Sequence, residues 1–156
     1  MAFWFGAPVN PCFTYPQYYF DGLQPICFQG QNSYIMYHGT TLANAMRIMN
    51  DGFRRSTGGM LGPGVYVTRS FEKASHYPTQ SYGQPLAVLQ LSVRVGKVKK
   101  ITYQGHPLQM TWHRHGYDTA WVPPNCGMVA SGLEEDCVYD PRRIKVLDII
   151  PNRRYW

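Results

Sequence analysis

The sequence is poor in charge and has no long hydrophobic run. Charged residues make up 15% of the 156, with 9 acidic against 15 lysine and arginine side chains. No apolar stretch reaches the roughly 20 residues that a membrane helix needs, so no membrane partner is expected. Residues 1–6 carry neither a basic region nor a cleavage site, and we expect no signal peptide. A hydrophobic content of 44% argues against disorder, and the length fits about one domain.

Apart from its four cysteines, nothing in the sequence indicates an oxidising compartment. Two disulfides are arithmetically possible from the four cysteines, which are Cys12, Cys27, Cys126 and Cys137. Reduced thiols in the cytoplasm, or also in the nucleus, are the expectation. His113 and His115 form no common zinc spacing with the last two cysteines, so we predict no metal site.

The charge balance is positive, at +6 with a pI near 9.2. Basic residues gather in short clusters at 54–55, 97–100, 142–145 and 153–154. Such clusters favour anionic partners, including phosphates, RNA and acidic protein surfaces. No zinc finger and no aromatic RNA-binding strand motif accompanies them. Most of these clusters are therefore interpreted as solvated surface, and weak binding of anionic partners through them is the alternative.

The chain divides into two parts. Residues 1–33 are rich in proline, glycine, glutamine and aromatic residues and predict an irregular arm packed on the domain. Residues 34–156 are expected to form a single domain. Within it, residues 41–51 predict a helix because apolar side chains recur at the spacing of one helical face. The predicted buried stripe consists of Leu42, Ala45, Met46 and Met49.

Local signals mark the ends of the helices. Thr40 or Thr41 suits the N-cap of the first helix, and Gly52 suits its end. Ser70 predicts the start of a second, short helix that ends near Tyr77.

The remaining pattern predicts short strands. They are expected at residues 33–38, 64–68, 86–95, 98–101, 136–139 and 144–150. The strand at 86–95 is predicted to be half-buried, because apolar and polar residues alternate in it. Residues 116–126 are interpreted as a loop. Two early helices and several later strands indicate an α+β fold with a mainly antiparallel sheet and short flanking helices.

A series of short motifs occurs in a fixed order along these elements. His38-Gly39-Thr40, interpreted as a histidine-glycine turn, precedes Gly62-Pro63-Gly64-Val65-Tyr66, and Tyr77 follows eleven residues after Tyr66. Glu135 then comes three residues before Val138-Tyr139-Asp140. This order resembles the catalytic domain of the poly(ADP-ribose) polymerase superfamily, in its diphtheria-toxin-like branch with a His-Tyr-Glu triad.

The resemblance covers residues 34–150 and implies an ADP-ribosyltransferase-like fold with a split β-sheet. Within the superfamily, the chain resembles the fish interferon-stimulated proteins induced by grass carp reovirus. The implied co-substrate is NAD+, and the implied acceptor is a protein or a nucleic acid. A role in innate antiviral defence follows from the resemblance alone.

The chemistry of the family requires such residues. Cleavage of the bond between nicotinamide and ribose builds positive charge on the ribose, which a carboxylate stabilises. The resemblance implies that Tyr66 and Tyr77 enclose the nicotinamide ring and that the backbone of Gly39 binds its carboxamide. His38 would bind the adenine-side ribose. Glu135 would bind the 2′-hydroxyl of the nicotinamide ribose and act with His38 and Tyr66 as the catalytic set.

The chain departs from the family pattern at two points. Ala74 stands where many members have a serine that bonds the nicotinamide amide, and one such hydrogen bond is worth about 0.5–1.5 kcal/mol. Residues 54–59 also form a shorter loop than the usual donor loop. Arg54 in this loop is a candidate contact for the adenosine or the pyrophosphate.

Each site residue also has a plainer structural interpretation. His38 would be an ordinary histidine at a strand end, and Gly39 would serve a tight turn. Tyr66 would be a core tyrosine, and Tyr77 would fill a gap beside its proline. Glu135 would belong to a solvated acidic run.

Three functions therefore compete. The favoured one is a transferase that moves one or a few ADP-ribose units from NAD+. The second is a catalytically silent module that binds NAD+, ADP-ribose or an RNA end and acts through partners. The third is an RNA 2′-phosphotransferase on the same fold, whose arginine and histidine signatures we do not find in this sequence.

Overall fold

The computed structural model describes residues 33–79, 81 and 83–152. The predicted arm over residues 1–33 lies outside them apart from its last residue, as do Cys12 and Cys27. The elements in chain order are β1 (Ser33–Thr41), α1 (Leu42–Asp51), β2 (Val65–Val67), α2 (Phe71–Ser75), β3 (Leu86–Arg94), β4 (Val98–Lys100), the 3₁₀ turn η1 (Trp112–His115), β5 (Thr119–Val122), β6 (Glu135–Val138), the 3₁₀ turn η2 (Pro141–Arg143) and β7 (Ile144–Asn152).

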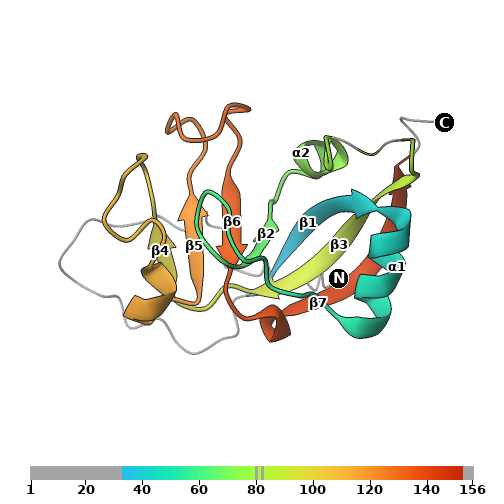
Figure 1. Ribbon diagram of the computed structural model, residues 1–156, viewed down its shortest axis with the longest axis horizontal. Coiled ribbons are helices and arrows are strands. Elements are labelled where there is room, and N and C mark those ends of the chain that lie inside the picture. Colours follow the sequence, from blue (N-terminus) through green and yellow to red (C-terminus); the bar gives the residue numbers. More distant parts are fainter. Residues whose placement is uncertain (1–32, 80, 82, 153–156) are drawn as a thin grey trace, which may run out of the picture. The chain divides into compact units, whose positions relative to one another are not determined.

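The strands form two sheets. One has the order β1-β3-β7 and the other β2-β6-β5-β4, and every pairing except that of β4 with β5 is antiparallel. A bridge between Tyr37 of β1 and Thr68, just after β2, connects them through two backbone hydrogen bonds of 2.7 and 3.0 Å. Figure 1 shows the two sheets next to each other, and α1 contacts all three strands of the first. The predicted α+β class is confirmed.

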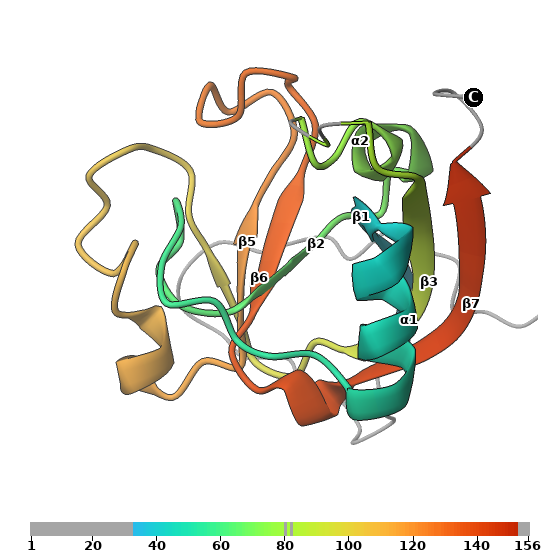
Figure 2. The ribbon, with the colours of Figure 1, turned by 45° about the vertical axis from the view of Figure 1, so that its right-hand side comes forward.

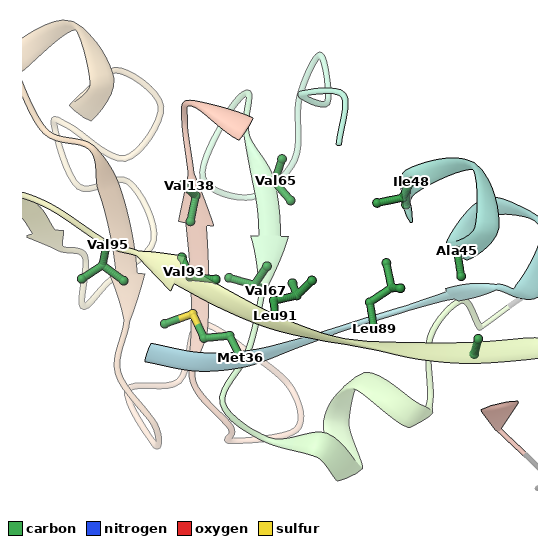
Figure 3. Close-up of a cluster of buried hydrophobic side chains, with 11 residues drawn as sticks. Met36, Ala45, Ile48, Val65, Val67, Leu89, Leu91, Val93, Val95 and Val138 are labelled. Atoms are coloured by element: carbon green, nitrogen blue, oxygen red, sulfur yellow. The ribbon is translucent and has the colours of Figure 1, made fainter. Parts of the chain in front are cut away.

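Helix α1 begins and ends as predicted but buries a different face. The Thr41 hydroxyl accepts a hydrogen bond from the amide of Asn44, and Gly52 ends the helix with φ 80°. Ala45 and Ile48 are its buried residues, whereas Met46 is 57% and Met49 43% exposed. The predicted stripe was therefore wrong at both methionines. The small Ala45 side chain lies at the middle of the contact with the sheet. Met46 lies about 100° further round the helix and therefore faces away from this contact. Figure 2 shows α1 beside β3, and Figure 3 shows Ala45 and Ile48 of α1 directed into the cluster of buried side chains.

Two segments are more regular than the sequence predicted. His38 lies in a strand as expected, but the turn expected at His38-Gly39 is wrong, since β1 continues to Thr41 and Gly39 pairs with Val88 of β3. Residues 119–122, expected within a loop, form the buried strand β5 between β4 and β6. Proline and glycine close to this four-residue strand hid it from pattern reasoning.

One buried cluster lies between α1 and the strands that it faces, and a second surrounds Trp112 beside the four-stranded sheet. Strand β3 is central, so its first four residues are all buried and alternation appears only in its second half. The prediction of a half-buried strand thus holds for that half alone. Leu89 and Leu91 of β3 pack with Val67 of β2 and Val138 of β6 (Figure 3). Within the described residues, no helix is long and apolar enough to cross a membrane.

Candidate active site

A cavity of about 340 Å³ opens where β1, β2 and α2 meet the loop before β2. All five residues that the sequence singled out line it, together with Lys73 and Ala74 of α2. The five are His38, Gly39, Tyr66, Tyr77 and Glu135. They come from three strands and the end of one helix, so only the tertiary fold brings them together.

Gly39 lies at the closest approach of β1 to α2. A Cβ atom added there would overlap the carbonyl oxygen of Ala74 and lie 2.8 Å from that of Tyr77. Strand β1 is at the edge of its sheet, and the backbone groups of Tyr37 point away from β3 to bond Thr68. Because backbone groups alternate along an antiparallel strand, the N–H and C=O of Gly39 point to the same edge. That edge faces the cavity and suits a planar amide ligand.

His38 is held as a neutral imidazole. Its Nδ1 lies 2.8 Å from the carbonyl oxygen of Tyr66. A carbonyl only accepts, so Nδ1 carries the proton. Burial lowers the pKa of His38, and the hydrogen bond to Tyr66 opposes this in part. The neutral ring leaves Nε2 as an acceptor for a ligand hydroxyl.

The two tyrosines differ in how firmly they are held. The Tyr66 hydroxyl donates to the carbonyl of Gly62 at 2.7 Å and accepts from the amide of Leu61 at 2.9 Å. Burial is the main cause that raises the pKa of this phenol. Tyr77 is 46% exposed on its side of the cavity. One ring is therefore fixed, and the other stands at the opening.

Glu135 faces the cavity beside a buried lysine. Its Oε2 lies 3.5 Å from Nζ of Lys73, and the side chains are 21% and 4% exposed respectively. The same ammonium donates to the backbone carbonyl of Glu134 at 2.8 Å. The carbonyl contact holds the cation in place beside the carboxylate of Glu135.

The neighbouring acidic residues turn away from the cavity. The Glu134 carboxylate accepts from the hydroxyl of Thr68 at 3.0 Å, from the amide of Arg69, and from Nε1 of Trp121 at 3.3 Å. Asp136 is 1% exposed. Burial raises its pKa well above the usual value, and hydrogen bonding to Glu134 adds to the effect. Of the acidic run, Glu135 alone lines the cavity.

A second hollow of about 230 Å³ shares His38 and Tyr66 with the first. Arg47 of α1 and Arg54 of the short loop line it. Two guanidinium groups next to the neutral His38 form a positive surface that suits an anionic ligand. Arg54, which the sequence offered as a candidate contact, lies in this hollow.

Sequence reasoning missed Lys73. A signal was available, because Lys73 and Tyr77 are four residues apart and Ser70 predicts a helix between them. Nothing in the sequence connected that lysine with Glu135. The expectation of no metal site stays a prediction; within the described part of the chain, no group of three or more His, Cys, Asp or Glu side chains is arranged to hold a metal.

Comparisons with known proteins match the part of the chain that carries most of the site residues. Residues 20–121 match the family model of the poly(ADP-ribose) polymerase catalytic domain. A curated relative, the poly [ADP-ribose] polymerase tankyrase of Caenorhabditis elegans, is 33% identical over 76 residues. This match covers 45% of the chain and 3% of the nematode protein, so the chain spans a small part of that relative's length. The family match includes His38, Gly39, Tyr66 and Tyr77 and ends before Glu135, whose position at the cavity comes from the structure.

Proposed function

The chain belongs to the poly(ADP-ribose) polymerase catalytic domain family, whose catalytic domains take NAD+ as co-substrate, and we propose that it is an NAD+-dependent ADP-ribosyltransferase. The observation that carries this proposal is the single cavity lined by the Gly39 strand edge, two tyrosines and the Glu135 carboxylate. Each feature suits one part of the reaction. The strand edge can bind the nicotinamide amide, the aromatic rings can stack on the flat heterocycle, and the carboxylate can stabilise the cation that develops on the ribose.

In this proposal, the nicotinamide carboxamide bonds the backbone of Gly39, and its ring lies between Tyr66 and Tyr77. The fixed Tyr66 ring would orient the heterocycle, because each offset-stacked contact adds about 0.5–1.5 kcal/mol beyond burial. Nε2 of His38 would accept from a hydroxyl of the adenine-side ribose. The second hollow, with Arg47 and Arg54, supports a pyrophosphate or adenosine contact there.

Glu135 acts on the reacting ribose. The bond between C1′ and the nicotinamide nitrogen breaks, and its electron pair leaves with neutral nicotinamide. The positive charge that remains on the ribose is stabilised by the carboxylate, which also accepts from the 2′-hydroxyl. A nucleophilic group of the acceptor then bonds C1′ and releases its proton to solvent.

We propose transfer of a single ADP-ribose unit to a protein or nucleic-acid acceptor. The resemblance to interferon-stimulated fish proteins supports a role in innate antiviral defence, in the cytoplasm or also the nucleus. One observation favours the alternative of a catalytically silent binding module. Ala74 lines the cavity at the position where a serine that hydrogen-bonds nicotinamide is usual. The missing hydrogen bond weakens the binding of nicotinamide.

The test is release of nicotinamide from NAD+ by the purified protein, together with the mass added to an acceptor. Glu135→Gln should lower the rate about 10²–10³-fold, the scale of removing one transition-state stabiliser, and leave NAD+ binding nearly intact. The matched control is Glu72→Gln, because Glu72 is exposed in α2 and does not line the cavity.

Equal rates for the parent and Glu135→Gln would remove Glu135 from the mechanism. Tight NAD+ binding without any nicotinamide release would replace the transferase by the silent module. Release without added mass would indicate an NAD+ hydrolase.

A further inference from the structure

A second charged cavity lies on the three-stranded sheet, and its lining shares no residue with the candidate active site. A cavity of about 390 Å³ is lined by Ser33, Ser92, Arg94, Arg142, Arg143 and Lys145. Ser33 pairs with Arg94 across β1 and β3, and Ser92 pairs with Lys145 across β3 and β7. Directly paired residues share a sheet face, so two rungs of the sheet present two hydroxyl and two cationic side chains together.

This face is opposite to the core face. The intervening residue Val93 is fully buried, whereas Arg94 and Lys145 are exposed. Ile35, on the same side as Ser33 by the strand alternation, is 48% exposed. The cavity is therefore a feature of the outer face of the sheet.

The charges of the cavity are only partly balanced. Arg142 forms an ion pair with Asp140 at 2.8 Å, and Arg143 forms one with Asp118 at 2.7 Å. Within residues 33–152 as described, no carboxylate pairs with Arg94 or Lys145. Two positive charges thus remain uncompensated beside two serine hydroxyls, which is the donor set that phosphate oxygens accept from.

The guanidinium groups are also held in position. Nη2 of Arg94 donates to the carbonyl of Arg142 at 3.2 Å, and Nη1 of Arg143 donates to the carbonyl of Arg94 at 3.3 Å. These reciprocal bonds connect the end of β3 to the turn η2. A preorganised pair of cations loses less side-chain entropy when an anion binds.

Asp118 connects the cavity to a tyrosine, because it pairs with Arg143 of the cavity lining and follows Tyr117 in the chain. Asp118 also accepts from the amide of Lys97. The ammonium groups of Lys97 and Lys99 lie 4.8 and 5.7 Å from the centre of the Tyr117 ring. Cations beside a partly exposed aromatic ring are typical of surfaces that bind single-stranded nucleic acid, where the ring stacks a base.

We propose that this cavity and Tyr117 bind the phosphodiester backbone of a single-stranded nucleic acid. Phosphates occupy the positions between the two serines and the uncompensated cations, and a neighbouring base stacks on Tyr117. Ser33 is five residues from His38 along β1, which is about 17 Å in an extended strand. The surface is therefore separate from the NAD+ cavity and does not depend on the proposed transferase activity.

The experiment measures the fluorescence anisotropy of a 5′-labelled 20-nucleotide oligouridine as the full chain is added. The titration is made at several salt concentrations. Lys145→Glu should weaken binding about five- to tenfold. It should also make the negative slope of log K against log salt shallower, by about 0.7 for each phosphate contact that is lost. The side chain of Lys145 has no described partner, so this change leaves the fold undisturbed. Arg94→Glu combined with Lys145→Glu should reduce binding further.

Arg114→Glu is the matched control, because Arg114 is exposed in η1 and does not line the cavity. It has the same net charge as Lys145→Glu, and it should bind within about twofold of the parent. The Lys145→Glu variant should keep the parent's melting temperature and rate of nicotinamide release. The same titration with oligothymidine in place of oligouridine shows whether the surface prefers RNA or single-stranded DNA.

Three results would overturn the proposal. One is the absence of oligonucleotide binding by the parent at 50 mM salt. Another is equal weakening by Arg114→Glu and Lys145→Glu, which would reduce the effect to net charge. The last is equal displacement of the oligonucleotide by polyglutamate of the same charge, which would assign the surface to acidic protein.

Discussion

The ammonium group of Lys73 lies 3.5 Å from a carboxylate oxygen of Glu135, and its side chain is 4% exposed. A cation so deeply buried needs nearby acceptors, and the carbonyl of Glu134 supplies the other one at 2.8 Å. The pair connects the helix that carries Ala74 to the strand that carries the candidate catalytic carboxylate. We interpret Lys73 as a positioning residue for Glu135.

Replacement of this lysine should slow the reaction through Glu135. Lys73→Met keeps the length of the side chain and removes the charge. Loss of a charged hydrogen bond of about 1.5–3 kcal/mol predicts nicotinamide release about tenfold to a hundredfold slower. In the double variant with Glu135→Gln, the effects should not add, since both changes act on the same group. Additive effects would mean that Lys73 does not act through Glu135. Lys100→Met is the control, because Lys100 is an exposed lysine.

Gly39 should tolerate no side chain. Gly39→Ala directs a methyl group onto the carbonyl oxygens of Ala74 and Tyr77, which are backbone atoms and move only if α2 moves. Overpacking of this kind costs about 1–3 kcal/mol, and we expect a lower melting temperature with loss of NAD+ binding. Gly58→Ala meets nothing within 4 Å and should keep the parent's stability. An unchanged melting curve for Gly39→Ala would contradict the close approach of β1 and α2.

Ala74 offers a test for gain of affinity. Ala74→Ser adds a hydroxyl at the cavity wall, where it can bond the nicotinamide amide. One hydrogen bond of about 0.5–1.5 kcal/mol predicts NAD+ binding up to about tenfold tighter by calorimetry. Ala74→Cys has a similar size but hydrogen-bonds weakly, so it should show little of this gain. Equal affinity of the serine variant and the parent would mean that the amide lies elsewhere.

The buried Asp136 predicts a dependence of stability on pH. Its pKa is raised in the folded chain by burial and by Glu134, whereas the unfolded value is about 3.9. The folded state thus binds more protons, and its stability falls as the pH rises from the unfolded to the folded pKa. The slope from this one group is at most about 1.4 kcal/mol per pH unit.

Asp136→Asn keeps the shape of the side chain and cannot ionise. Denaturant unfolding between pH 4 and pH 8 should show that the variant loses less stability than the parent as the pH rises. Asp51→Asn, at an exposed position of α1, should follow the parent. A parallel pH course for Asp136→Asn would indicate that Asp136 is ionised in the folded chain.

The starts of the helices could be predicted from the sequence, because they depend on residues that are close together in the chain. The caps at Thr41 and Ser70 accept from amides three residues on, so the sequence alone predicted where α1 and α2 begin. The five candidate site residues that the motif order located all line the cavity. Spacing along the chain sufficed for these, since each motif has its own short-range pattern.

Only the tertiary structure decided the rest. It continued β1 through Gly39, exposed Met46 and Met49, and brought Lys73 to Glu135 across 62 residues of sequence. The physical reason is that burial and pairing depend on which element arrives next to a residue, a property that no local pattern contains. The sequence by itself determined the residue types and the local caps of this protein, and long-range packing decided which of its side chains meet.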